Sequence, residues 1–130
     1  MQNIIEIRNL TKSFGDIRAV RDLSFSVRRG ELFAFLGVNG AGKSTTISIM
    51  CGLLEKDGGS ISICGTDTEK NMQSLKRRIG VVFQNSVLDQ ALSVRDNLSV
   101  RAALYGIRGK EFARRLDELA ELLDFGGLLG

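Results

Sequence analysis

The stretch Gly37-Val38-Asn39-Gly40-Ala41-Gly42-Lys43-Ser44-Thr45 decides how this chain folds and what it binds. It matches G-x-x-x-x-G-K-[ST], a glycine-rich loop that joins a strand to a helix and holds phosphate. The apolar run Leu32–Leu36 before the loop predicts a buried strand, and Thr45–Leu54 after it predicts a helix. The helix is predicted from four residues at helical spacing: Ile47, Met50, Cys51 and Leu54. The order strand, loop, helix is the one that a phosphate-binding loop requires.

A polyphosphate needs several N–H donors that converge on it. The loop holds three glycines that can take positive φ and bring the backbone close to an anion: Gly37, Gly40 and Gly42. The N–H groups of the loop and of the helix N-terminus then form an anion nest. Lys43 supplies positive charge for the β- and γ-phosphates, and the Ser44 hydroxyl is placed to bind Mg²⁺. The alternative is a hairpin that turns at Asn39–Gly40, and the predicted flanking strand and helix favour the phosphate loop.

Composition places the chain among soluble globular proteins. Its 130 residues correspond to one domain at most, with 43% apolar and 25% charged residues. The formal charge of +3, from 18 basic and 15 acidic residues, is too weak to indicate nucleic acid as a partner. The short basic clusters, at 28–29, 76–78 and 114–115, are interpreted as solvated surface. We therefore expect no nucleic acid partner.

The cysteine and membrane signals are both weak. Cys51 and Cys64 are the only cysteines and lack CxxC spacing, so we expect reduced thiols in or near the core of a cytosolic protein. The start of the chain carries Glu6 and lacks an apolar core segment, so no signal peptide is expected. The longest apolar stretch, Leu32–Leu36, is too short to cross a bilayer. Any association with a membrane is therefore expected to come through a partner.

Periodicity predicts the remaining elements. Strands are expected at 4–10, 17–27, 60–64 and 79–83, with a turn at 58–59 and a polar loop at 65–70. Helices are expected at 72–78, 93–105 and 110–123. Ser93 is the predicted N-cap of the second of these helices, with Asp96 completing a capping-box variant and Gly106 ending it. The third helix has an apolar face and is expected to end at Gly126–Gly127. That face comprises Phe112, Leu116, Leu119, Leu122 and Leu123.

Several segments in order reveal a family resemblance. Phe14 lies in LTKSFG at 10–15, and Gln84 ends GVVFQ at 80–84, directly after a predicted strand. Taken alone, Phe14 is a core aromatic and Gln84 a loop amide. Together with VRDLSFSV at 20–27, Gly30–Glu31 and the phosphate loop, they resemble the N-terminal part of an ATP-binding cassette (ABC) transporter ATPase. The similarity runs from Ile4 to Leu104, and more loosely to the end.

This resemblance implies a fold and a set of binding residues. The implied fold is α/β, a P-loop NTPase core with an N-terminal antiparallel β portion, here incomplete. Residues 1–130 would run from the P-loop through the Q-loop to the start of the helical subdomain. Phe14 would stack on the adenine of ATP, where the family often has Tyr. The phosphates would lie against Gly37, Val38, Asn39, Gly40, Ala41, Gly42, Lys43 and Ser44, with Thr45 near the α-phosphate. Ser44 and Gln84 would contribute to the Mg²⁺ shell.

The resemblance also implies partners. Gln84 would sense the γ-phosphate, and the Gln84–Leu92 loop would contact transmembrane permease subunits. A second ABC ATPase subunit would complete a dimer at the cytoplasmic face of the membrane. The sequence of this loop resembles that of exporters of the ABC-2 type, so solute export is expected. Two alternatives stay open: a non-transport ABC protein that acts on ribosomes or DNA, and a binding fragment that does not hydrolyse ATP.

The hydrolytic elements of the family are missing from this sequence. There is no LSGGQ-like signature, and no run of four apolar residues leads into the Asp and Glu of a Walker B motif. Leu122-Leu123-Asp124 lies on the predicted amphipathic helix and is rejected, as is a kinase interpretation of Asp124-Phe125-Gly126. The chain has no His to serve as the family's switch histidine. We therefore expect no catalytic residue here, nucleotide binding without turnover, and ATP hydrolysis by a longer parent protein.

Overall fold

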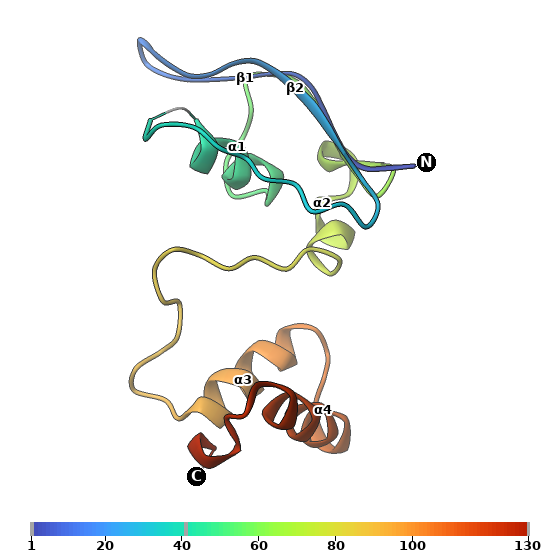
Figure 1. Ribbon diagram of the computed structural model, residues 1–130, viewed down its shortest axis with the longest axis vertical. Coiled ribbons are helices and arrows are strands. Elements are labelled where there is room, and N and C mark those ends of the chain that lie inside the picture. The colour runs from blue at the N-terminus through green and yellow to red at the C-terminus, as the bar shows by residue number, and fades with distance from the viewer. Residues whose placement is uncertain (1, 41, 130) are drawn as a thin grey trace. The chain divides into compact units, whose positions relative to one another are not determined.

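A computed structural model describes residues 2–40 and 42–129 of the chain. The chain forms two compact units that divide between Gly80 and Val81 (Figure 1). The first unit combines a sheet with two helices, and the second consists of helices and irregular segments. The architecture confirms the predicted fold class, and every strand pair in the described residues is antiparallel.

The sheet of the first unit has four strands in the order β2-β1-β3-β4. β1 (Asn3–Phe14) and β2 (Ile17–Arg28) form a long hairpin. β3 (Gly58–Ile63) pairs with the other edge of β1, and β4 (Thr66–Asp67) extends the sheet beyond it. The two N-terminal strands are as predicted, with longer bounds. The turn expected at 58–59 is wrong because β3 already begins there, and the expected polar loop at 65–70 contains β4.

A β-bulge in β1 brings Ile7 and Leu10 into the same core. Side chains alternate along a strand, so residues three apart normally point to opposite faces. The register with β2 shifts between these two residues, and Asn9 between them has φ of +50°. Asn9 Nδ2 donates to Asp22 Oδ1 at 2.7 Å, which fixes the bulge against β2. As a result both apolar side chains are buried.

Two helices complete the core of the first unit. α1 (Lys43–Met50) contributes Ile49 and α2 (Thr68–Lys76) contributes Leu75 to a cluster of buried strand residues. The strand members of this cluster are Ile7, Leu10, Val20, Ile61 and Ile63. α2 begins four residues before the predicted helix because the Asp67 carboxylate accepts from Glu69 N at 2.9 Å and caps it. The core therefore ties both helices to the sheet.

Both cysteines lie beside this core as free thiols. Cys51 follows α1 and Cys64 follows β3, and each is partly buried. Burial raises the pKa of the Cys51 thiol, so it is less reactive than an exposed thiol at neutral pH. The expectation of free thiols in or near the core is confirmed for Cys64, which packs against the core cluster.

α1 is shorter than predicted, and the residues that it buries differ in part from the predicted set. It ends at Met50 because Gly52 takes φ of +67°, with Gly52 N donating to Ile49 O and Leu53 N to Ser48 O. These two bonds form a Schellman motif, which satisfies the last carbonyls of the helix. The predicted apolar set is right in part: Met50 and Leu54 pack against the core. The fully buried residues are instead Thr46 and Ile49, and Ile47 is exposed.

The two apolar runs predicted as buried strands are irregular and exposed. Leu32 and Leu36 are 99% and 86% exposed, and Val82 is 99% exposed. A strand buried on both faces needs hydrogen-bonded neighbours at its edges, and neither run pairs with a strand in the described part of the chain. The first run is instead held by aromatic stacking, because the Phe33 and Phe35 rings lie 5.0 and 5.5 Å from that of Phe25 on β2.

In the second unit, α3 (Val94–Leu104) begins at the predicted cap. Asp96 N donates to Ser93 Oγ at 3.1 Å, and Ser93 Oγ donates to Asp96 Oδ2 at 2.7 Å. The next turn holds the buried Asn97, whose side-chain amide binds backbone groups of the preceding loop. Asn97 Nδ2 donates to Asp89 O at 2.9 Å, and Asp89 N donates to Asn97 Oδ1 at 2.8 Å. The predicted helix and capping box are therefore confirmed.

α4 (Gly109–Leu123) is the predicted amphipathic helix, but its end and its face differ in detail. It stops at Leu123 because Asp124 takes the left-handed conformation, so Gly126–Gly127 do not end it. Those glycines begin the short 3₁₀ helix η1 (Gly126–Leu128). The helix buries Leu116 and Ala120, whereas Leu122 and Leu123 stay exposed. Only part of the predicted apolar face is thus covered.

Candidate nucleotide-binding site

The predicted phosphate loop caps the N-terminus of α1. Gly40 and Gly42 have φ of +86° and +79°, and Gly42 is the N-cap residue. Thr46 N and Thr46 Oγ1 both bind Gly42 O, each at 2.8 Å, which fixes the first turn of the helix. Loop followed directly by helix excludes the alternative of a hairpin at Asn39–Gly40, since no paired strand flanks that turn in the described residues.

Gly42 also joins the loop to the sheet. A Cβ built at this position would lie 2.3 Å from Ala19 O and 3.1 Å from Val20 Cγ2, both on β2. No side chain fits in that space, so the glycine allows the loop to pack directly on the strand. Gly40 has the same sign of φ but faces open space, since a Cβ added there would meet nothing within 4 Å. The two glycines therefore serve different purposes.

The Lys43 side chain folds back over the loop. Its Nζ donates to Gly37 O and, at 2.8 Å, to Val38 O. The ammonium thus lies against the backbone of the loop, next to the positive end of the α1 dipole. An anion that enters the loop would meet both charges, so this arrangement suits phosphate.

The other predicted loop residues differ in their exposure. Val38, Asn39, Gly40 and Ser44 are exposed, and Thr45 is half-buried. Ala41 lies outside the described residues. The buried Thr46 hydroxyl, which sequence analysis did not single out, serves the helix start.

Phe14 lies at the end of β1, on the same hairpin that supports the loop. It pairs with Ile17 across the turn and is 47% exposed. Lys12 Nζ lies 5.5 Å from the centre of its ring. Val20, which contacts Gly42, follows Ile17 by three residues, or about 10 Å along a strand. One hairpin thus positions both the exposed ring and the phosphate loop.

Gln84 lies in the second unit, in an exposed irregular segment. It belongs to a different unit from the phosphate loop, so its place in the site stays a prediction. The rest of the Gln84–Leu92 loop is exposed but anchored at two points. Asn97 binds its backbone at Asp89, and the Arg101 guanidinium donates to Val87 O. These bonds give the loop a defined shape within its own unit.

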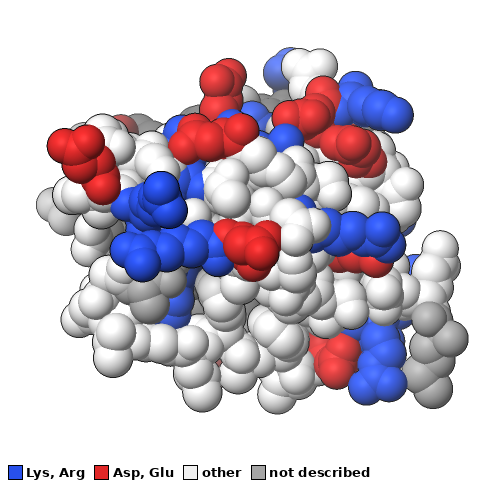
Figure 2. Space-filling view, turned by 90° about the horizontal axis from the view of Figure 1, so that it is seen from above, with Lys and Arg blue, Asp and Glu red and all other residues white. Residues whose placement is uncertain are grey.

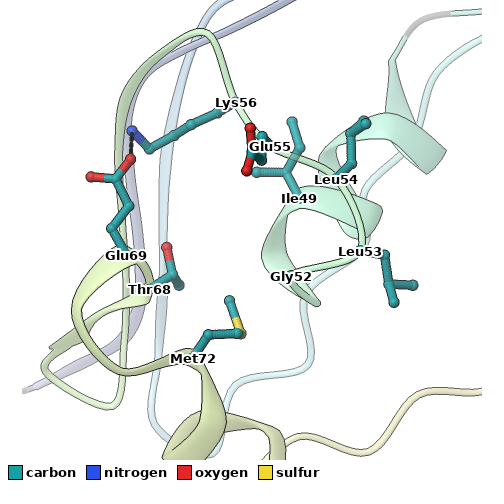
Figure 3. Close-up of a pocket in the computed structure, with 9 residues that line it drawn as sticks. All are labelled: Ile49, Gly52, Leu53, Leu54, Glu55, Lys56, Thr68, Glu69 and Met72. Atoms are coloured by element: carbon teal, nitrogen blue, oxygen red, sulfur yellow. Dashed lines mark ion pairs between the residues drawn. The ribbon is translucent and has the colours of Figure 1, made fainter.

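A separate cavity of about 710 Å³ lies at the other end of α1 (Figure 3). Leu54 and Met72 are among its apolar walls, and the carboxylates of Glu55 and Glu69 also line it. Lys56 extends across to Glu69, with Nζ 2.7 Å from Oε1. Two carboxylates and an ammonium that is already paired do not suit a polyphosphate. The cavity, which sequence analysis did not foresee, is therefore not a candidate for phosphate binding.

The charged surface is mixed in sign. On the face shown in Figure 2, basic and acidic side chains lie beside each other with uncharged residues between them. Several oppositely charged neighbours in the chain form ion pairs, including Arg8 with Glu6 at 2.7 Å and Arg28 with Glu31 at 3.3 Å. Neighbouring charges of opposite sign largely cancel beyond a Debye length. Long-range attraction of an anion to this face is accordingly weak.

Two further features bear on ligands and membranes. Within residues 2–40 and 42–129, no three His, Cys, Asp or Glu side chains cluster as a metal cage. A hydroxyl such as that of Ser44, together with phosphates and water, is nevertheless a donor set that Mg²⁺ accepts. In the same described ranges, none of the helices combines the length and the apolar character needed to span a bilayer.

Comparison with known proteins identifies the family. Residues 20–129 match the family model described as ABC transporter. The chain is 38% identical over 120 residues to the probable multidrug ABC transporter ATP-binding protein YbhF of Escherichia coli (strain K12), covering 92% of this chain and 21% of that protein. It is 42% identical over 124 residues to the Nod factor export ATP-binding protein I of Burkholderia orbicola (strain AU 1054), covering 95% and 40%.

Solved structures agree with the sequence matches. An ATP binding subunit of an ABC transporter superposes with a TM-score of 0.83 at 32% identity, over 97% of this chain and 52% of its own. The cbiO1 protein of Clostridium perfringens, part of the ABC transporter complex cbiONQ, gives 0.83 at 27% identity, over 99% and 53%. The chain thus spans about half of these structures and less of the curated relatives. Since the family model covers more than half of this sequence, the chain belongs to the ABC transporter family.

Proposed function

We propose that residues 1–130 are the N-terminal part of an ABC ATP-binding domain and that this part binds Mg-ATP. The observation that carries the proposal is the loop at the start of α1, with the Lys43 ammonium already folded over it. Helix dipole, loop N–H groups and a mobile lysine are the parts that a phosphate site needs. Membership of the family supports ATP as the nucleotide.

Each part of the nucleotide has a proposed partner. Residues 37–44 hold the phosphates, Thr45 lies near the α-phosphate, and the exposed Phe14 ring stacks on the base. The Ser44 hydroxyl and the Gln84 amide hold Mg²⁺, which neutralises phosphate charge when bound. The ribose of a nucleotide separates its base from its phosphates. The Phe14 ring and the phosphate loop lie at different points of the β1–β2 hairpin, which suits that separation.

The 130-residue chain is expected to bind Mg-ATP without hydrolysing it. Hydrolysis needs a positioned water and a general base, and this sequence offers no Walker B carboxylate or histidine for that role. Calorimetry should therefore detect binding, while a phosphate-release assay on the same sample stays at background. Magnesium-dependent turnover that disappears in Lys43→Ala would contradict the expectation, and absence of any binding would reject the proposed function.

In the longer protein, we propose that this domain hydrolyses ATP to energise transport of a solute, with export as the direction. The names of the relatives, which include Nod factor export and multidrug transport, support that choice. Permease subunits would contact the Gln84–Leu92 loop and hold the domain at the inner face of the membrane. A second ABC ATPase subunit would form the dimer. The exposed but anchored shape of the loop suits a contact surface.

Gln84→Ala in the full-length protein is expected to affect coupling more than ATP affinity. One neutral hydrogen bond contributes about 0.5–1.5 kcal/mol net, so the affinity should stay within a few-fold of the wild type. Hydrolysis stimulated by the permease should fall further than that. Asn85→Ala, a neighbouring amide in the same loop, is the matched control. Loss of ATP affinity with intact stimulation would contradict this role for Gln84.

A further inference from the structure

Asp57 clamps the end of β1 from a loop far away in the sequence. Its Oδ1 accepts from Lys12 Nζ at 2.8 Å, and its Oδ2 accepts from Ser13 N at 2.6 Å. Asp57 N in turn donates to Thr11 O at 3.0 Å. Three consecutive residues of β1 are therefore bound by a single aspartate, directly before Phe14.

The clamp also places a cation on the Phe14 ring. Lys12 Nζ lies 5.5 Å from the ring centre, within the range of a cation–π interaction. The Lys12 side chain is only 14% exposed, although Phe14 beside it is 47% exposed. The ammonium is thus held between a carboxylate and a ring, and a long side chain that usually moves freely has one defined position.

The charge state of Asp57 favours this arrangement at neutral pH. The hydrogen bond from Lys12, followed by that from Ser13 N, holds the pKa of the Asp57 carboxyl below its usual value. The carboxylate is therefore ionised under ordinary conditions, and both of its bonds persist. Exposed ion pairs stabilise a fold little, so the positioning of the ammonium is the larger consequence of the pair.

We propose that Asp57 is a positioning residue for the base of the nucleotide: through Lys12 and the backbone of Ser13, it fixes the Phe14 ring in an orientation ready to stack. The proposal rests on the proposed function, since it assumes that this ring receives the base. A ring held in place before binding loses less conformational freedom when the base arrives. Asp57 and Lys12 thereby contribute to affinity for a base without touching the phosphates.

Two ligands separate a role in base binding from a role in phosphate binding. Mg-ATP uses the ring and the loop, whereas inorganic tripolyphosphate uses the loop alone. In the 130-residue chain, Asp57→Asn is expected to weaken Mg-ATP about two- to fivefold, the size of an exposed cation–π contact, and to leave tripolyphosphate unchanged. Asp16→Asn, in the turn between β1 and β2, makes the same change of charge without removing the bonds to Lys12 and Ser13, and should change neither affinity.

A double-mutant cycle tests whether Asp57 acts through the ring. In a Phe14→Ala background, Asp57→Asn should cause no further loss of Mg-ATP affinity, because the ring that it positions is gone. An equal loss in both backgrounds, or a parallel loss of tripolyphosphate affinity, overturns the proposal. Lys12→Gln removes the ammonium while keeping Asp57 and should reproduce the result if Asp57→Asn proves unstable in thermal unfolding.

The same measurements distinguish failure of this inference from failure of the proposed function. A wild-type chain that binds neither ligand rejects nucleotide binding, and the inference with it. A chain that binds both, with no effect of Phe14→Ala on Mg-ATP, keeps the phosphate loop but rejects the ring as a base platform. If Phe14→Ala weakens binding of Mg-ATP but Asp57→Asn leaves it unchanged, only the proposed role of Asp57 is overturned.

Discussion

Lys43→Ala should lower the affinity of the chain for Mg-ATP about ten- to a hundredfold. A charge-assisted hydrogen bond contributes about 1.5–3 kcal/mol, and the lysine is the one side chain that the loop motif assigns to phosphate charge. In the free chain, Nζ binds Gly37 O and Val38 O, so it already lies at the loop. Little rearrangement is then needed when phosphate enters, and most of the interaction should appear as affinity.

The same substitution should hardly change stability. The carbonyls released by Lys43→Ala belong to residues 37 and 38, which are exposed, so water can replace the lost bonds. Lys70→Ala on α2 removes an equal charge from an exposed site and is the matched control. Calorimetry on the wild type and both variants measures the effect. Equal affinities for all three would remove Lys43, and with it the loop, from the nucleotide site.

Local patterns were enough to predict the elements that depend on local interactions. The two strands β1 and β2 follow from their apolar residues, and the start of α3 follows from Ser93 and Asp96. The loop follows from the glycine spacing, because Gly40 and Gly42 take the positive φ that glycine permits. In each case the determining residues lie within a few positions of one another.

The errors arose where structure depends on distant partners. An apolar run such as Leu32–Leu36 reveals a tendency to be buried, but a strand also needs neighbours with which to pair. The described residues supply none, so the run stays irregular and rests on Phe25 through its aromatic rings. The apolar residues of α1 were assigned only in part for a related reason, since the Gly52 motif ends the helix before Cys51 and Leu54, the last two residues of the predicted set.

In the candidate site, too, some residues could be predicted from local sequence and others could not. Lys43 and Ser44 could be assigned from the motif alone, whereas the contact between Lys12 and Asp57 joins residues 45 positions apart. That contact follows from the register of β1 with β3, in which Thr11 lies opposite Gly58. Register depends on the whole sheet, including the bulge after Ile7. Sequence patterns therefore predicted the loop and the Phe14 ring of the candidate site, but not the groups around that ring.

Gly42→Ala should destabilise the first unit far more than Gly40→Ala, although both residues have positive φ. A left-handed conformation costs a residue with a Cβ about 1–2 kcal/mol. Both substitutions carry that cost, with φ of +79° and +86° respectively. Gly40→Ala carries little else, because its Cβ would face open space. It is thus the matched control for strain without crowding.

Gly42→Ala adds a collision that no side-chain rotation can relieve. The new Cβ would lie 2.3 Å from Ala19 O, a backbone atom of β2, so the loop and the start of α1 must move away from the strand. Overpacking of this kind costs about 1–3 kcal/mol, which gives a total loss of about 2–5 kcal/mol in the free energy of unfolding. Such movement would also disturb Ile49, the α1 residue in the core.

A urea titration followed through the amide NMR signals of β1 and β2 reports on the first unit alone and compares the two variants. Equal midpoints would mean that the close approach of Gly42 to Ala19 does not constrain the loop. A lower midpoint for Gly42→Ala would show that packing against β2 requires glycine at this position of the motif. Lys43 follows Gly42 directly, so the contact that places the glycine on β2 also places the lysine at the phosphate loop.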